Sequence, residues 1–213
     1  MLYEKIFCIG FWKQGTSSLH KLFLDNNLKS IHDSCIDYVD ILDKYDCFTD
    51  NYCLIRDYKK YYNLYPNSLF ILNTRPLKKW LLSAYKHIYI LKDKNDKCNK
   101  LWPPTESQIK DMIVIRENHY KSVLDFFKDK SNNLIVINIE EPGWQNIVLN
   151  KLNLKCTANN LIMNKNKHQI DKDILELIEL TINNVLSEHN NPYELLLPNY
   201  SINNYEYVNN ILT

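Results

Sequence analysis

Short apolar runs alternate along this chain with longer stretches in which apolar residues recur every three or four positions. Apolar runs of four to eight residues are typical of buried strands, and the longer spacing is typical of amphipathic helices. The strand candidates are residues 5–9, 28–31, 68–73 and 134–139. This alternation predicts an α/β fold with three layers, in which a mostly parallel central sheet lies between helices.

Several helix boundaries are marked by the residues that begin them. Thr105 and Gln108 have capping-box spacing and open a long helix. Pro76 suits the first turn of a helix that extends to about Leu91. The segment 38–65 has weak periodicity, and we expect short helices there. The remaining helix candidates are 16–25, a short helix from Trp144, and 171–188.

Length and composition favour one soluble domain. The chain has 213 residues, 45% of them hydrophobic, and no linker or repeat divides it, so we expect residues 1–213 to form a single domain. Its 26 Lys and Arg balance 25 Asp and Glu, so we expect no nucleic-acid partner and any anion site must be local. The apolar runs fall far short of the ~20 residues that span a bilayer, and no secretory leader opens the chain. We therefore expect a cytoplasmic protein without membrane attachment.

The six cysteines lack the CxxC spacing of zinc sites. Several lie in apolar, strand-like contexts, which favours buried free thiols over metal ligands or disulfides.

Glycine is rare, yet two of the three glycines lie at the two ends of one short loop. Gly10 ends the first apolar run and Gly15 precedes the first helix. Free amides and the positive end of a helix dipole make such a loop suited to phosphate. The nucleoside-triphosphate version has Lys directly after the second Gly. Here Thr16 takes that place and the lysine lies inside the loop, at Lys13.

This arrangement resembles the 5′-phosphosulfate loop of the sulfotransferase family, which reads P-K-x-G-T-T/S followed by S-L or W. Trp12 stands where the family usually has Pro. The matching residues are Lys13, Gly15, Thr16, Ser17, Ser18 and Leu19. The resemblance implies that the donor is bound by Lys13, Gln14, Gly15, Thr16, Ser17 and Ser18. It also implies the P-loop NTPase-like fold of that family. Because glycine is rare, neither loop glycine has a nearby substitute, and we expect Gly15→Val to remove donor binding while leaving the fold largely intact.

A second element follows the strand candidate 68–73. Arg75 comes at the end of this strand, and Ser83 follows eight positions later on the next helix. Guanidinium and hydroxyl donors can converge on one phosphate. Sulfotransferases use Arg and Ser at this spacing to hold the 3′-phosphate of 3′-phosphoadenylyl sulfate (PAPS), which implies the same role for Arg75 and Ser83.

The resemblance covers roughly residues 4–155, with specific motifs only at the two phosphate sites. The cytosolic branch of the family places a Trp where this chain has Ser18, and it stacks that Trp on adenine. The same branch completes the 3′-phosphate site with a C-terminal Arg-Lys-Gly, for which Lys165 and Lys167 are weak substitutes. Adenine recognition is therefore unassigned.

The family implies in-line transfer of a sulfuryl group from PAPS to a hydroxyl or amine, which leaves 3′,5′-ADP. Lys13 would stabilise the leaving phosphate, and the scheme needs no metal ion. Branches that use a carboxylate base place it at the end of the second strand. Asp33 is our first choice for the base and His32 the second.

Two other functions stay open. One is a P-loop kinase for a nucleoside or small molecule, and the other is a nucleotide-binding module without turnover. The acceptor would be a small molecule or carbohydrate, and its pocket would be bordered by segment 37–62, which is rich in Tyr, and by segment 92–105. The sequence carries no indication of the oligomeric state.

Overall fold

A six-stranded sheet with the order β2-β3-β1-β4-β5-β6 lies at the centre of the molecule. The computed structural model describes residues 2–32, 39–155, 169–188 and 200–201. Strands β1 to β5 are parallel, and β6 pairs antiparallel with β5. The strands are β1 (Ile6–Cys8), β2 (Ser30–His32), β3 (Cys47–Thr49), β4 (Leu69–Thr74), β5 (Leu134–Asn138) and β6 (Tyr200–Ser201). The expected α/β fold with a mostly parallel sheet is confirmed.

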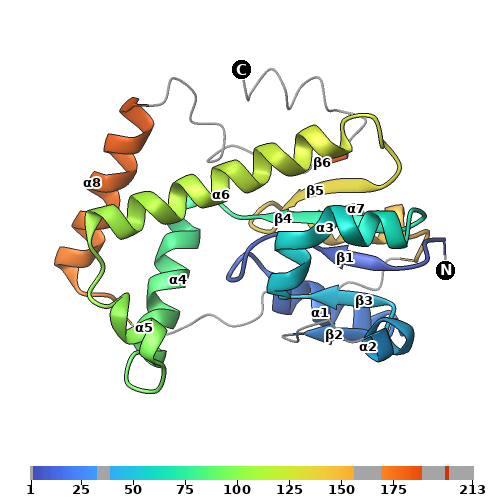
Figure 1. Cartoon of the computed structure of the whole chain (residues 1–213), viewed down its shortest axis with the longest axis horizontal. Helices are drawn as coiled ribbons and strands as arrows, with labels where there is room; N and C mark the ends of the chain where they lie inside the picture. The colour runs from blue at the N-terminus through green and yellow to red at the C-terminus, as the bar shows by residue number, and fades with distance from the viewer. Residues whose placement is uncertain (1, 33–38, 156–168, 189–199, 202–213) are drawn as a thin grey trace.

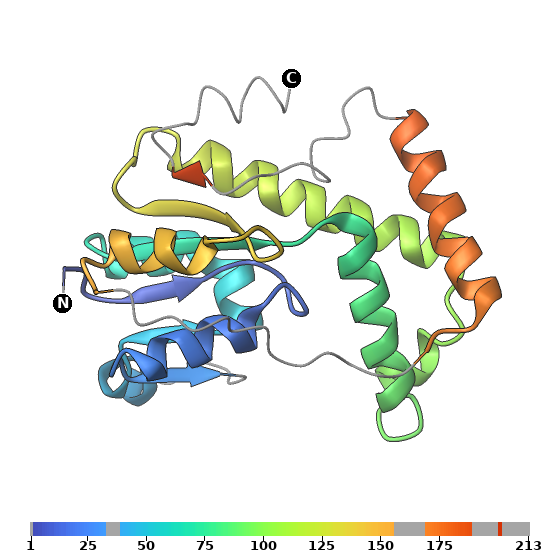
Figure 2. The same cartoon turned by 180° about the vertical axis from the view of Figure 1, so that it is seen from behind.

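Helices cover both faces of this sheet. Helices α3 (Tyr52–Leu64) and α6 (Glu106–Phe127) pack on one face, and α1 (Thr16–Asp25) and α7 (Trp144–Lys151) on the other (Figures 1 and 2). Every residue of β1, β3, β4 and β5 is buried. Their apolar runs are the pattern required of parallel strands with helices on both sides.

A separate group of helices lies to one side of the sheet (Figure 1). It contains α4 (Leu77–Leu91), α5 (Asp96–Lys100) and α8 (Lys172–Glu188). Their apolar side chains form a further cluster with Ile109 and Ile113 from the start of α6. Because the end of α6 packs on the sheet, this one helix joins both parts of the core. Within the described ranges, none of the helices is both long enough and apolar enough to span a membrane.

Several elements differ from the sequence expectation. In place of short helices alone, the segment 38–65 contains α2 (Val39–Lys44), strand β3 and the long α3. The second strand begins at Ser30 and not at residue 28. Helix α5 and strand β6 were not expected. The capping box of Thr105 and Gln108 is confirmed, since each side chain accepts from the other residue's amide.

The cysteines agree with the expectation of free thiols. Cys8, Cys47 and Cys53 are free and buried, and Cys98 is free and half-buried. Cys35 and Cys156 lie outside the described residues.

Gly10 marks a close approach of two chain segments. A Cβ at this position would lie 2.0 Å from the carbonyl oxygen of Asn73. The amide of Gly10 donates to Asn73 Oδ1 at 3.1 Å, and Asn73 Nδ2 donates to the carbonyl of Gln14 at 2.9 Å. The side chain of Asn73 therefore holds the loop after β1 against the end of β4.

Candidate active site

The loop between β1 and α1 has the backbone geometry of an anion site. Lys13 and Gly15 both adopt left-handed backbone conformations, with φ of 62° and 85°. Gly15 is the N-cap of α1, and no side chain caps this helix. The amides of a first helical turn have no partner within the helix. Because no side chain caps them here, the start of α1 is suited to an external anion.

Gly15 also has little space around it. A Cβ there would lie 2.7 Å from Ile139 Cγ2, at a φ that side chains rarely adopt. Gly15→Val should therefore cost stability as well as donor binding, because the change brings backbone strain and a clash with Ile139, which packs on the core that α1 and α7 form with the sheet.

Lys13 is half-buried, and three effects act on its charge. Burial lowers the pKa of its ammonium, the carboxylate of Asp50 opposes this, and the charge of Arg75 lowers the pKa further, with a net lowering. Lys13 thus lies within electrostatic range of one carboxylate, Asp50, and one further cation, Arg75.

Arg75 follows β4 and reaches the same loop. Its Nη1 lies 3.5 Å from the carbonyl oxygen of Lys13, at the limit of a hydrogen bond. Its Nε donates to Glu140 Oε1 at 2.7 Å, and Nη2 lies 2.6 Å from the same oxygen. Lys79 donates to the other oxygen, Oε2, at 2.7 Å. Two cations therefore share the Glu140 carboxylate at the edge of the loop.

The two neighbouring cations favour the ionised form of Glu140. Burial raises its pKa, but the hydrogen bond from Lys79 and the charge and hydrogen bond of Arg75 outweigh burial, so the net pKa is lowered. The side chains of Glu140 and Arg75 are 24% and 25% exposed, so both can be reached from solvent.

His32, the last residue of β2, meets the first turn of α1. Its Nε2 lies 3.3 Å from Ser17 Oγ and 3.7 Å from Asp50 Oδ2. On its other side, Nδ1 lies 2.8 Å from Thr49 Oγ1. The ring also stacks on His20 with centroids 5.3 Å apart.

The partners of Thr49 determine which nitrogen of His32 carries the proton. The Thr49 hydroxyl donates to the carbonyl oxygen of Ile31 at 3.2 Å, and a hydroxyl has one hydrogen. Both contacts of Thr49 are satisfied only if His32 Nδ1–H donates to it. Nε2 of the neutral ring is then an acceptor that faces Ser17, and Asp50 lies where it can stabilise the protonated ring.

The remaining residues expected at the site have different surroundings. Gln14 is fully buried and turned away from solvent, and Thr16 and Ser18 are buried. Ser83 is half-buried on α4 and makes no hydrogen bond to Arg75 within the described part of the chain. Asp33, Lys165 and Lys167 lie outside the described residues.

Sequence reasoning missed two acids of this site. Asp50 directly follows the unexpected strand β3, and Glu140 follows β5. The available signal was the same for both, an acidic residue after a short apolar run. Over residues 2–32, 39–155, 169–188 and 200–201, no group of three or more His, Cys, Asp or Glu is arranged to hold a metal ion.

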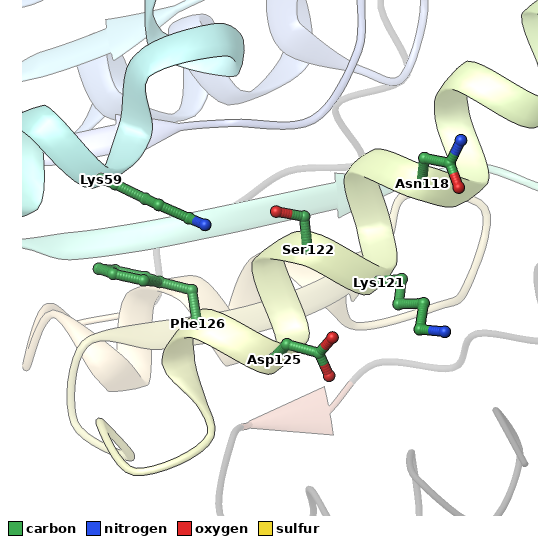
Figure 3. Close-up of a pocket in the computed structure, with 6 residues that line it drawn as sticks. All are labelled: Lys59, Asn118, Lys121, Ser122, Asp125 and Phe126. Carbon is green, nitrogen blue, oxygen red and sulfur yellow. The ribbon is translucent and has the colours of Figure 1, made fainter.

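A pocket of about 460 Å³ lies elsewhere, between α3 and α6. Figure 3 shows Lys59 of α3 reaching toward Ser122 and Phe126 of α6. Its lining contains no residue of the loop, of β2 or of the Arg75 turn. The pocket is therefore separate from the cluster of Lys13, Arg75 and His32.

A family model for the sulfotransferase domain matches residues 29–114. The match supports assignment to the sulfotransferase family. The matched residues make up less than half of the 213, begin after the loop of Lys13 and include Arg75 and Ser83. No curated protein matches the chain. The match to a sulfotransferase domain supports a transferase enzyme with sulfuryl transfer as its general activity.

Proposed function

We propose that the protein transfers a sulfuryl group from PAPS to a hydroxyl or amine of a small-molecule or carbohydrate acceptor. The observation that carries the proposal is the contact of Arg75 with the Lys13 loop at 3.5 Å, beside a helix start without a side-chain cap. Two cations next to free amides suit a donor with phosphates at both its 3′ and 5′ positions. We also propose that residues 1–213 form one domain, because α6 packs in two core clusters.

In the proposed reaction, the loop residues stabilise the leaving nucleotide and Arg75 and Ser83 hold its 3′-phosphate. The acceptor oxygen or nitrogen forms a bond to sulfur while the bond from sulfur to the bridging phosphate oxygen breaks. The electron pair of that bond moves to the leaving 3′,5′-ADP, where Lys13 and the amides of Gly15, Thr16 and Ser17 stabilise the charge. Arg75 and Ser83 bind the 3′-phosphate, with Ser18 near the loop phosphate.

The acceptor's proton moves to a base. His32 Nε2 is our choice, because it is an acceptor directed at Ser17 and has Asp50 at 3.7 Å to stabilise the protonated ring. Asp33, our first choice from the sequence, is the alternative base and lies outside the described residues. Gln14 would contribute only its backbone, since its side chain is buried.

The test compares affinity for 3′,5′-ADP and for 5′-AMP, which lacks the 3′-phosphate. The parent should prefer 3′,5′-ADP. Arg75→Ala should weaken the binding of 3′,5′-ADP roughly 10- to 100-fold, because a hydrogen-bonded charge pair with the 3′-phosphate is lost. The variant should then bind 3′,5′-ADP and 5′-AMP about equally. Arg56→Ala is the matched control, since Arg56 is an exposed arginine paired with Asp57 on α3. Lys13→Ala should abolish transfer. Equal affinity of the parent for both nucleotides would contradict the proposal.

One observation favours a kinase as the second candidate. Asp50 follows the strand next to β1 and acts on the charge of Lys13. Kinases with a phosphate loop use an acid to hold magnesium near the phosphates. A thermal shift with ATP and magnesium that exceeds the shift with 3′,5′-ADP would favour this candidate. Stabilisation by 3′,5′-ADP without transfer to any acceptor would favour the inactive nucleotide-binding module.

A further inference from the structure

Arg116 of α6 is a fully buried arginine next to the candidate site. Its Nη2 donates to the carbonyl oxygen of Arg75 at 2.6 Å, and its Nε donates to Tyr120 Oη at 3.2 Å. The guanidinium also lies over the rings of Trp80 and Tyr120, 5.2 Å and 4.6 Å from their centroids. Burial of a charge is costly, and apolar side chains commonly replace such groups without loss of stability. Packing alone would therefore favour an apolar residue here, which indicates a further role for Arg116.

Tyr120 continues the connection into the loop. Its hydroxyl donates to Gln14 Oε1 at 2.9 Å, and the amide of Phe11 donates to the same oxygen at 3.1 Å. A backbone amide can only donate, so the atom of Gln14 that faces Phe11 must be the oxygen. The loop is thus held from inside by the side chain that sequence reasoning had placed at the ligand.

These bonds form a continuous path from one proposed phosphate site to the other. It begins at the carbonyl of Arg75 and passes through Arg116, Tyr120 and Gln14 to the amide of Phe11. A second tie runs from Gln14 through Asn73 to Gly10. Because every member is held by neighbours that are themselves packed, the path restricts movement of the Arg75 turn relative to the loop.

We propose that Arg116 and Tyr120 are positioning residues that fix the separation between the Lys13 loop and Arg75. This inference rests on the proposed function, because a fixed separation matters for a ligand that uses both elements at once. A nucleotide with two phosphates then binds without the cost of ordering the second element. A nucleotide with one phosphate gains nothing from the fixed separation.

Tyr120→Phe tests this, because it removes the hydroxyl and keeps the ring. The affinity for 3′,5′-ADP should fall about five- to tenfold, while the affinities for 5′-AMP and 3′-AMP stay within about twofold. Tyr58→Phe is the matched control. Tyr58 is a buried tyrosine whose hydroxyl bonds to the Ser122 carbonyl at 2.8 Å, outside the path. An equal loss for all three nucleotides would overturn the proposal, since general destabilisation affects them alike.

Hydrogen exchange separates this proposal from the proposed function. Tyr120→Phe should speed exchange of the amides of Gly10 and Phe11 relative to the parent and to Tyr58→Phe, with no nucleotide present. Unchanged exchange there would overturn the positioning role. A parent that does not prefer 3′,5′-ADP over 5′-AMP would contradict the proposed function, and the exchange result would still decide whether Tyr120 fixes the loop.

Discussion

Arg75 Nε and Nη2 lie 2.7 Å and 2.6 Å from one oxygen of Glu140, so a carboxylate of the protein itself occupies one edge of this guanidinium. A carboxylate and a phosphate compete for the same paired donors. A nucleotide phosphate that reaches Arg75 must therefore share the guanidinium with Glu140 or displace the Glu140 carboxylate from it.

Glu140→Gln should tighten the binding of 3′,5′-ADP about three- to tenfold. The amide keeps an acceptor for Arg75 and removes the negative charge that repels the phosphate. Calorimetric titration measures this, and Glu141→Gln is the control because it removes the same charge one residue away. Weaker binding by Glu140→Gln would show that Glu140 orients Arg75 and does not compete with the ligand.

The same carboxylate should make folding stability depend on pH. The folded pKa of Glu140 is lowered from its ordinary value of 4.5, despite burial, by Lys79 and Arg75. Its contribution is therefore fully present above about pH 4.5 and is lost as pH falls through the folded pKa. Urea unfolding should find the parent more stable than Glu140→Gln at pH 7, with the difference shrinking below pH 4.5. A difference that grows on acidification would contradict this assignment.

The sequence predicts the strands with long apolar runs and both cationic elements, Lys13 and Arg75. It misses β3, because the three residues Cys47–Thr49 are too few for a local pattern and are fixed by pairing with β1 and β2. Asp50 and Glu140 were missed for a different reason. They meet the cations only because the sheet order places β3 beside β1 and β5 beside β4, and no local pattern encodes that order.

His32→Asn should lower kcat by roughly 10²- to 10⁴-fold if His32 Nε2 takes the acceptor's proton. KM for the donor should change little, because the donor is bound by other residues. His20→Asn is the matched control, since His20 stacks on His32 and bonds to Ser30 at 2.8 Å. The decisive comparison is Asp33→Asn in the same assay. A large loss there, with little effect of His32→Asn, would make Asp33 the base.

Gly15→Ala and Gly143→Ala should differ in stability although the two glycines share a backbone conformation. Their φ angles are 85° and 83°, and each is the N-cap of a helix. Gly143→Ala should cost about 1–2 kcal/mol for the left-handed conformation alone, because nothing lies within 4 Å of its Cβ position.

Gly15→Ala should cost about 1–3 kcal/mol more than Gly143→Ala, because its Cβ would lie 2.7 Å from Ile139 Cγ2. Urea unfolding of both variants gives the difference. Adding Ile139→Ala should recover the extra cost in Gly15→Ala but not in Gly143→Ala, since only the first pair is in contact. Equal costs for the two single variants would contradict this prediction, because they would mean that the Ile139 side chain can shift at no cost in stability.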